Sequence, residues 1–311
     1  MNETRLDIVA IGEAMIEFNA ARAPDPRTFL QGFGGDTSNM AIAAARLGAR
    51  SGYVTRVGDD AFGRQLLALW RDENVSTDGV AVDADAPTGV YFVAHGAHGH
   101  EFSYLRSGSA ATRMTPASLP LSVLRRTRVL HLSGISQAIS TSACDACFAA
   151  IDVARAAGAQ ISYDTNLRLK LWPLARAKAI VFETLRAADW ALPSLDDAKH
   201  LFGHDHPLRI VEACHAHGCT IVALKLGSDG CLVSDGVRHE RIDGILVAAV
   251  DATGAGDCFD GAFVTRMVAG DDAFAAARYA NRAAALATTG YGAVAPLPRA
   301  ADVARLAAEG P

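Results

Sequence analysis

The chain has 311 residues, of which half are hydrophobic, so it can bury a large core. Its 29 basic and 34 acidic residues give a net charge of −5, which argues against a general nucleic-acid binder. No apolar run reaches the roughly 18–20 residues of a membrane-spanning helix, and no signal-peptide core follows the N-terminus, so we expect a cytoplasmic protein whose six cysteines are reduced thiols.

Short apolar runs alternate with longer helical patterns along the chain, which is typical of an α/β fold with a parallel sheet. Strands are predicted at residues 8–11, 52–57, 129–132, 160–163, 190–192, 220–225 and 245–250. Helices are predicted at residues 39–47, 62–74, 141–157, 174–187, 196–202, 208–217, 259–269, 273–287 and 300–308. Parallel strands joined by crossover helices are expected to be buried on both faces.

Two zones, residues 12–35 and 87–107, break this alternation with short alternating runs and glycine-rich turns. In the second zone a turn at residues 96–99 suits a hairpin, and Tyr104 and Arg106 lie on one face of its second strand. Together the zones predict a small β flap. Because ligands of open α/β sheets bind beyond the C-terminal strand ends, such a flap could exclude water from a site there.

Adjacent glycines, Gly34 and Gly35, allow a backbone to approach a ligand closely. They precede the predicted helix that starts near Asn39, and Asp36 or Ser38 is a candidate N-cap for it. These residues alone allow two interpretations, a turn that binds a ligand and a tight turn followed by a capped helix.

Polar residues also follow the predicted strand 160–163, at the C-terminal edge of the sheet. Asp164, Asn166 and Arg168 alternate there in an extended stretch. An arginine at this edge can hold a phosphate or a carboxylate through two parallel hydrogen bonds. A surface ion pair is the alternative interpretation of Arg168.

The most informative stretch is residues 251–263, where Gly254, Ala255 and Gly256 precede Asp257 and an apolar helical segment. A tight glycine turn before a helix leaves backbone N–H groups unpaired, and with the helix dipole they form an anion site. A carboxylate beside that site fits a base that deprotonates a hydroxyl attacking a phosphoryl group. The alternative is that Asp257 only caps the helix.

The strings at residues 34–39 and 251–263 lie more than 200 residues apart. In this order they resemble the two signatures of the ribokinase-like sugar kinases, also called the phosphofructokinase-B family. The resemblance covers nearly the whole chain. It implies a single kinase domain over residues 1–311, a three-layer α/β sandwich with a mostly parallel central sheet, and a small β-sheet lid formed from about residues 12–35 and 87–107.

The resemblance also implies roles for individual residues. Asp257 would be the catalytic base, and the amides of Gly254, Ala255 and Gly256, together with Arg168, would stabilise charge on the transferring group. Sugar hydroxyls would be bound by Gly34, Gly35 and Asn39. With Trp172, the segment Asp164–Arg168 is most like the branch that contains 2-keto-3-deoxygluconate kinase, which implies a substrate pocket lined by Tyr91, Tyr104, Arg106 and Arg168.

ATP and Mg²⁺ are the cofactors that the resemblance implies, with a monovalent cation such as K⁺ near Asp251 and Thr253. The family's Asn-x-x-Glu magnesium segment reads Ser194-x-x-Asp197 here, so only an indirect metal contact is expected of Asp197. Capping of a helix by Ser194 and a packing role for Asn281 are the alternatives. The nucleotide-binding positions implied are Asn166, Ser194, Lys225, Gly227, Ser228, Gly230, Gly254, Gly256 and Asn281.

We therefore expect an ATP-dependent kinase that phosphorylates the primary hydroxyl of 2-keto-3-deoxygluconate, with small molecules rather than nucleic acid or membrane as partners. A fructokinase or ribokinase is the alternative within the family. A sugar- or nucleotide-binding regulator is a more remote one, and a dinucleotide dehydrogenase is disfavoured because no Gly-x-Gly-x-x-Gly follows the first strand. The apolar flap predicts a homo-oligomer.

Overall fold

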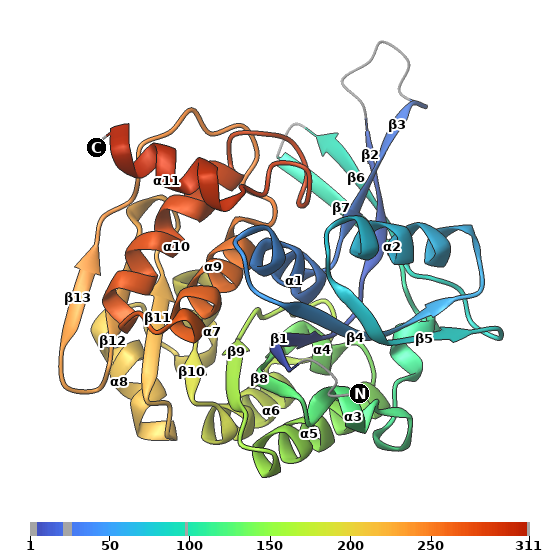
Figure 1. Ribbon diagram of the computed structural model, residues 1–311, viewed down its shortest axis with the longest axis horizontal. Coiled ribbons are helices and arrows are strands. Elements are labelled where there is room, and N and C mark those ends of the chain that lie inside the picture. The colour runs from blue at the N-terminus through green and yellow to red at the C-terminus, as the bar shows by residue number, and fades with distance from the viewer. Residues whose placement is uncertain (1–4, 21–26, 97–98, 310–311) are drawn as a thin grey trace.

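The described residues of this computed structural model are 5–20, 27–96 and 99–309. They form a nine-stranded sheet that lies between two layers of helices (Figure 1). A second, four-stranded sheet is separate from it. The expected three-layer α/β fold with a small β-sheet is confirmed. The predicted hairpin tip at residues 97–98 and residues 21–26 of the first zone lie outside the described residues.

The central sheet has the strand order β13-β12-β11-β10-β9-β8-β1-β4-β5. Neighbours pair in parallel except β12, which runs antiparallel to β11 and β13. In β1, residues 8–11 are fully buried because helices cover both faces. The strands are β1 (Leu6–Ile11), β4 (Ser51–Gly58), β5 (Ser76–Asp83), β8 (Thr127–Ser133), β9 (Gln160–Asp164), β10 (Trp190–Ala191), β11 (Ile221–Lys225), β12 (Cys231–Ser234) and β13 (His239–Ile242).

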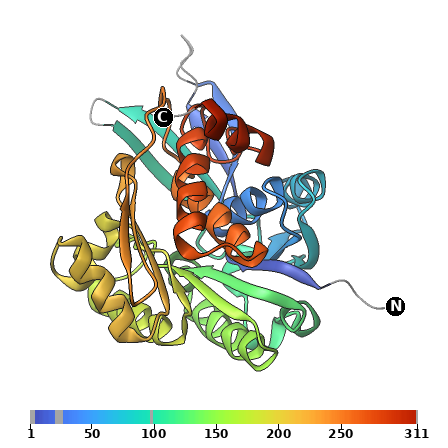
Figure 2. The same cartoon turned by 60° about the vertical axis from the view of Figure 1, so that its left-hand side comes forward.

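Each face of the sheet has its own hydrophobic core, and Figure 2 shows the two helix layers from the side. One core is covered by α1 (Asp36–Arg46), α2 (Ala61–Asp72), α9 (Ala255–Ala269), α10 (Ala273–Ala287) and α11 (Ala300–Glu309). The other is covered by α3 (Leu121–Leu124), α5 (Thr141–Ala156), α6 (Leu174–Ala187), α7 (Leu195–Phe202) and α8 (Pro207–His217). The short α4 (Gly134–Ala138) follows β8 directly, and 3₁₀ turns lie at Ala110–Arg113, Pro116–Ser118 and Gly227–Asp229.

The small sheet joins the two zones that break the α/β alternation. Its order is β3 (Phe29–Gly34), β2 (Met15–Ala20), β6 (Val90–Gly96) and β7 (Gly99–Leu105). The pairs β2–β3 and β6–β7 are antiparallel, and β2 pairs in parallel with β6. Residues about 70 positions apart in the chain, such as Ile16 and Val90, thus lie side by side.

The two faces of the small sheet carry different aromatic groups. Phe18 and Phe92 stack with ring centroids 5.3 Å apart, and Phe62 of α2 meets Phe18 edge-on at 5.8 Å. Tyr91 alternates with Phe92 along β6, so it lies on the opposite face, where it stacks on Tyr104 at 5.7 Å. The first face fixes the sheet to α2, and the second is left for other contacts.

The strand predicted at residues 245–250 is wrong. Residues 243–249 have no regular secondary structure, and Leu246 is fully exposed. The run is apolar, but it adds no strand to the edge of the sheet, which ends at β13. It instead runs over the surface until the Val250 amide donates to the Thr288 carbonyl at 2.7 Å.

The prediction missed β5, β12 and β13. Strand β5 reads Ser-Thr-Asp-Gly-Val-Ala-Val-Asp and lies at an edge of the sheet, where polar residues and a glycine are tolerated. Strands β12 and β13 are four residues each, too short for a periodic pattern.

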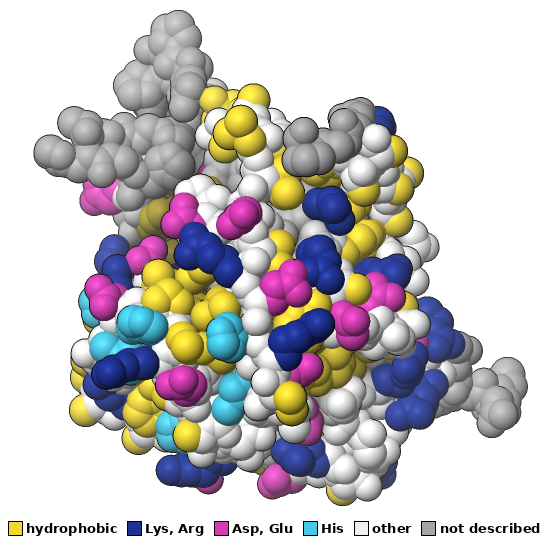
Figure 3. Space-filling view, turned by 90° about the vertical axis from the view of Figure 1, so that its left-hand side faces the viewer, with side chains coloured by type: hydrophobic (Ala, Val, Ile, Leu, Met, Phe, Trp, Pro, Cys, Tyr) yellow, Lys and Arg dark blue, Asp and Glu magenta, His cyan; other side chains and the backbone are white. Residues whose placement is uncertain are grey.

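The surface carries charges of both signs (Figure 3), and the cysteines form no disulfides. On the face in Figure 3, Lys and Arg side chains are interspersed with Asp and Glu, so this face carries no large field of one sign. All six cysteines are buried and free. Within residues 5–20, 27–96 and 99–309, no helix is long and apolar enough to cross a membrane.

Candidate active site

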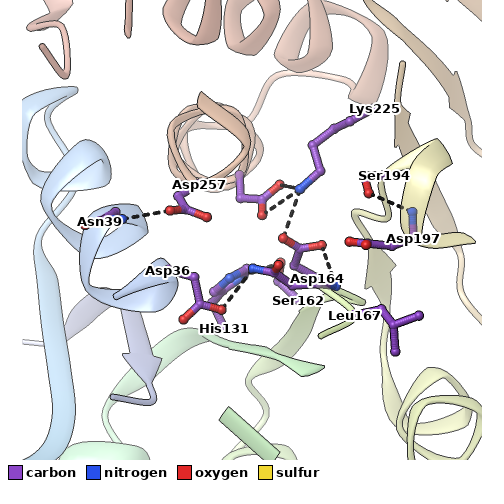
Figure 4. A network of polar contacts seen from close by, with 12 residues as sticks. Asp36, Asn39, His131, Ser162, Asp164, Leu167, Ser194, Asp197, Lys225 and Asp257 are labelled. Atoms are coloured by element: carbon purple, nitrogen blue, oxygen red, sulfur yellow. Dashed lines mark hydrogen bonds and ion pairs between the residues drawn. The ribbon is translucent and has the colours of Figure 1, made fainter. Parts of the chain in front are cut away.

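The candidate site lies at the C-terminal edge of the central sheet. Strand β1 has β4 on one side and β8 on the other, so the chain reverses its direction of travel across the sheet there, where open α/β folds bind ligands. Asp164 ends β9 and Lys225 ends β11, and the first turns of α1 and α9 carry Asp36, Asn39 and Asp257 (Figure 4). Residues predicted from distant strings are thus brought to one place.

The turn before α9 explains the glycine of the signature. Gly254 is the N-cap residue with φ of 78°, and a Cβ there would come within 2.8 Å of the Ala293 carbonyl oxygen. The prediction that the Ala255 amide faces an anion is corrected, because this amide donates to the Ala252 carbonyl at 3.2 Å. The following amides of the first turn, from Gly256 and Asp257, are the donors expected to face an anion.

Asp257 is not the N-cap residue of α9. It lies inside the first turn, is partly exposed, and its Oδ2 accepts a hydrogen bond from Asn39 Nδ2 at 2.8 Å. Burial, and next the negative charge of Asp36, raise the pKa of Asp257 to about 7, while the bond from Asn39 opposes the rise. A carboxyl that titrates near neutral pH is suited to take a proton from an alcohol.

The first turn of α1 holds the groups that face Asp257. Gly35 has φ of 116°, and a Cβ on it would lie 2.4 Å from the Glu13 carbonyl oxygen, so glycine is required. Asn39 is 3% exposed, and its Oδ1 has no hydrogen-bond partner within the described residues. Asp36 Oδ2 accepts from Asn166 Nδ2 at 3.0 Å, and burial raises the pKa of Asp36.

Replacing Asp36 by asparagine is expected to shift the pH dependence of kcat. The charge of Asp36 disfavours ionisation of Asp257, so its removal lowers the pKa of Asp257 from near 7 toward the ordinary carboxyl range. Activity then persists to lower pH, because the ionised base survives there. A pH profile of kcat measures this, with Asp196→Asn on the exposed surface of α7 as the control, and an unmoved acidic limb would contradict the assignment.

The small sheet contributes Tyr91, Tyr104 and Arg106. Tyr91 is 5% exposed and donates through its hydroxyl to Glu17 Oε2 at 2.5 Å. A Cβ on Gly34 would lie 2.2 Å from that hydroxyl oxygen, so glycine makes room for the Tyr91 ring. The Arg106 guanidinium lies 5.7 Å from the Tyr104 ring centroid.

Arg106 has a partner that the sequence did not predict. Its Nε donates to Glu13 Oε2 at 2.8 Å, and the Ser109 hydroxyl donates to Glu13 Oε1 at 2.5 Å. Glu13 is 1% exposed and lies two residues after the end of β1. A charged residue just beyond the C-terminal end of a buried parallel strand is the signal that could have identified it.

Arg168 also acts electrostatically on Tyr104. Burial raises the pKa of Tyr104, and the positive charges of Arg106 and Arg168 both act against that rise. The Arg168 side chain is half-exposed and lies 3.7 Å from Asp197. Two guanidinium groups therefore act on one exposed tyrosine ring.

The predicted nucleotide residues lie around β11, α7 and α10. Lys225 Nζ contacts Asp164 and Asp260, as described below. Ser194 is the N-cap of α7 and accepts from the Asp197 amide at 3.3 Å, as its alternative interpretation expected. Asn281 is buried and donates to the Asp243 carbonyl at 2.7 Å. The turn after β11 exposes Gly227 and Ser228, and Gly230 has φ of 93°.

The loop before Gly254 is held by Asp251. Its Oδ1 accepts from the Thr253 amide at 2.9 Å and the Thr253 hydroxyl at 2.6 Å, and its Oδ2 accepts from the Gly292 amide at 3.0 Å. These bonds tie the turn before α9 to the segment after α10.

Comparisons with known proteins agree with this geometry. A family model described as "pfkB family carbohydrate kinase" matches residues 5–300. Fructokinase-2 of Solanum habrochaites is 35% identical over 320 residues, covering 96% of this chain and 95% of the relative. The 2-dehydro-3-deoxygluconokinase of Thermoproteus tenax is 34% identical over 316 residues, covering 96% and 94%.

A solved structure is also similar over its full length. A fructokinase from Vibrio cholerae, in a form with fructose, ADP and potassium ion bound, is 28% identical, with a TM-score of 0.87 and coverage of 98% of this chain and 99% of that one. The chain therefore belongs to the pfkB family of carbohydrate kinases and is an ATP-dependent sugar kinase.

Proposed function

We propose that this kinase transfers the γ-phosphoryl group of ATP to the primary hydroxyl of 2-keto-3-deoxygluconate, giving 2-keto-3-deoxy-6-phosphogluconate. The observation that carries the proposal is the partly exposed carboxyl of Asp257, held by Asn39 at the N-terminus of α9 and titrating near neutral pH. The aromatic and cationic side chains of Tyr104, Arg106 and Arg168 support the choice of a sugar acid.

Asp257 acts as the general base. As the sugar oxygen attacks the γ-phosphorus, its proton passes to the Asp257 carboxylate, and the bond from the γ-phosphorus to the bridging oxygen breaks to release ADP. The Asn39 amide orients the carboxylate through the hydrogen bond that its Nδ2 donates to Asp257 Oδ2. The Gly256 and Asp257 amides, with Arg168, oppose the charge on the transferring group.

The sugar acid would lie against the small sheet. The exposed Tyr104 ring can cover the apolar face of the substrate, and a guanidinium can pair with its carboxylate through two hydrogen bonds. Arg168 is half-exposed and only loosely paired, at 3.7 Å, so it has donors to offer. Gly34 and Gly35 bring the backbone close to the same place.

Magnesium fits the site as a partner of the nucleotide phosphates. Mg²⁺ keeps several waters and takes one or two carboxylates, and Asp197, held near Arg168 by the Ser194 cap, is the candidate. When bound, the ion neutralises charge on the β- and γ-phosphoryl oxygens. In the part of the chain that the structure describes, no group of three or more His, Cys, Asp or Glu side chains could hold a metal by itself.

We extend the proposal to a monovalent cation near Asp251. The support is the V. cholerae fructokinase, whose structure includes a potassium ion, and the loop that Asp251 closes with Thr253 and Gly292. Oxygen ligands of this kind suit hard cations.

Fructose is the second candidate substrate, and one observation favours it. Glu13 is buried and neutralises Arg106, which weakens the case that Arg106 binds a carboxylate. Fructokinase-2 of Solanum habrochaites and the deoxygluconokinase of Thermoproteus tenax are nearly equally similar to this chain, at 35% and 34% identity.

A coupled ATP-consumption assay with 2-keto-3-deoxygluconate, fructose and ribose side by side tests the proposal. The highest kcat/KM is expected with the sugar acid. A higher value with fructose or ribose would replace the proposed substrate. Binding of sugar or nucleotide without turnover of any of the three would favour a regulator over an enzyme.

Two paired variants separate sugar acids from neutral sugars. Glu13→Gln releases Arg106 from its partner, so the KM for 2-keto-3-deoxygluconate is expected to fall or hold. Glu13→Gln with Arg106→Met removes the guanidinium without leaving a buried unpaired carboxylate, and that KM should rise about 10- to 100-fold, the value of a charge-assisted hydrogen bond. The KM for fructose should change far less, and equal losses for both sugars would refute the role of Arg106.

A further inference from the structure

Lys225 lies in a buried cluster with two carboxylates (Figure 4). Its Nζ lies 3.0 Å from Asp164 Oδ2, and 2.9 Å and 3.0 Å from the two carboxylate oxygens of Asp260. The Asp260 side chain is 1% exposed and the Asp164 side chain 7%. A lysine ammonium has three N–H donors, so these three contacts can engage all of them.

The cluster joins three elements that meet below the anion site. Asp164 ends β9, Lys225 ends β11, and Asp260 lies on α9. Asp260 follows Asp257 by three residues, so the two carboxyls are neighbours on adjacent turns of one helix. A Cβ placed on Gly256 would lie 3.7 Å from Lys225 Nζ, so the ammonium also lies against the first turn of α9.

Burial and charge act against each other in this cluster. Burial opposes a charged lysine, but Asp164 and Asp260 together raise the pKa of Lys225. Burial alone would raise the pKa of Asp164, and the Lys225 charge holds it below the usual carboxyl range. Burial raises the pKa of Asp260, the Lys225 charge opposes the rise, and the nearby charge of Asp164 adds to it. His131, which donates to or accepts from Ser162 at 3.0 Å, is neutral because burial lowers its pKa to about 4.

We propose that Lys225 is a positioning residue for Asp257, fastened through Asp260 and Asp164, rather than a ligand of the nucleotide phosphates. The cross-link fixes the first turn of α9 on the ends of β9 and β11. It therefore sets where the catalytic carboxyl and the amides beside it lie relative to the sheet. The inference requires a phosphoryl-transfer reaction at Asp257 but not the identity of the sugar.

Asp260→Asn is the decisive variant, because it replaces the carboxyl group that makes two of the three contacts with Lys225 Nζ and leaves the Lys225–Asp164 pair intact. Positioning predicts that kcat falls about tenfold or more, while the KM for ATP stays within about twofold. If Lys225 instead binds the nucleotide phosphates, the reverse is expected. Asp260→Asn would then free the Lys225 ammonium from one of its partners, so kcat would be kept and the KM for ATP would fall. The sugar used is whichever one supports turnover in the substrate panel, so a wrong substrate assignment does not affect the outcome.

Lys225→Met and Lys225→Arg supply a second readout. The Lys225 charge lowers the pKa of Asp257, so its loss should move the acidic limb of the kcat profile to higher pH, and arginine should restore it. Lys225→Met leaves two buried carboxylates together, so if it does not fold, Lys225→Met with Asp260→Asn is measured instead. Lys199→Met, which breaks an exposed pair with Asp196 at 2.7 Å, is the matched control and should leave all constants unchanged.

The inference is overturned if Lys225→Met, or that double variant, raises the KM for ATP tenfold or more while kcat and the acidic limb stay where they are. It is supported if the loss is in kcat, the limb moves, and arginine restores both.

Discussion

Asp257→Asn is expected to lower kcat by about 10²–10⁴-fold, the contribution typical of a positioned general base. Asparagine matches the carboxylate in shape, and its oxygen can still accept the bond that Asn39 Nδ2 donates at 2.8 Å. The amide cannot take the hydroxyl proton, and it also removes a charge that burial and Asp36 destabilise. The fold should therefore persist, and the loss should lie in the chemical step.

Steady-state kinetics and calorimetric titration of the sugar together check this result. A large drop in kcat with a dissociation constant for the sugar within a few-fold of the original supports the base. Asp145→Asn, on the exposed surface of α5, is the matched control. Turnover close to that of the unaltered protein in the Asp257 variant would remove this residue from the mechanism.

Gly261→Ala is expected to lower the free energy of unfolding by about 1–3 kcal/mol, the usual result of overpacking. Gly261 lies where α9 crosses α1, and a Cβ there would come within 2.7 Å of the Met40 carbonyl oxygen and 2.9 Å of Ala43 Cβ. Alanine is the better helix former by about 1 kcal/mol, so propensity alone predicts the opposite sign. The two helices must move apart, which displaces Asn39 from Asp257.

Thermal unfolding and kcat measured on the same preparation test both effects. A displacement of this kind is expected to reduce kcat about 10- to 100-fold. Ala269→Val adds two methyl groups to an exposed position of the same helix and should change stability by no more than about 0.5 kcal/mol. Equal stability of Gly261→Ala and the unaltered protein would show that a methyl group fits between α9 and α1, which would contradict the prediction.

The local sequence pattern was sufficient to predict most helices and strands of the α/β part of the fold. Helices at residues 174–187 and 273–287 were predicted with the bounds that the structure has, because Pro173 and Asp272 mark their starts. The string at residues 245–250 shows the limit of this approach, since an apolar run by itself does not determine whether residues pair with the edge of a sheet.

The site was predicted as a set of separate strings, and its internal partners were not. Asn39 and Asp257 came from two signatures, and the structure brings them within hydrogen-bond distance. Glu13 and Asp260 were missed because their roles depend on side chains that are distant in sequence, Arg106 and Lys225. A lone acid in the apolar run of α9 was nonetheless a signal, since a buried carboxylate needs a cation.

The ion pair between Glu13 and Arg106 has a mechanical consequence for the small sheet. Glu13 lies just before β2 and Arg106 just after β7. The pair therefore links two positions 93 residues apart, at the end of the sheet where β2 begins and β7 ends. The opposite end of the sheet, where Phe29 pairs with Ala20 and where Phe29 and Leu30 are exposed, lies away from this ion pair. The ion pair therefore holds the end of the sheet that carries Tyr91 and Tyr104 next to the C-terminal end of β1, independently of the aromatic contact between the sheet and α2.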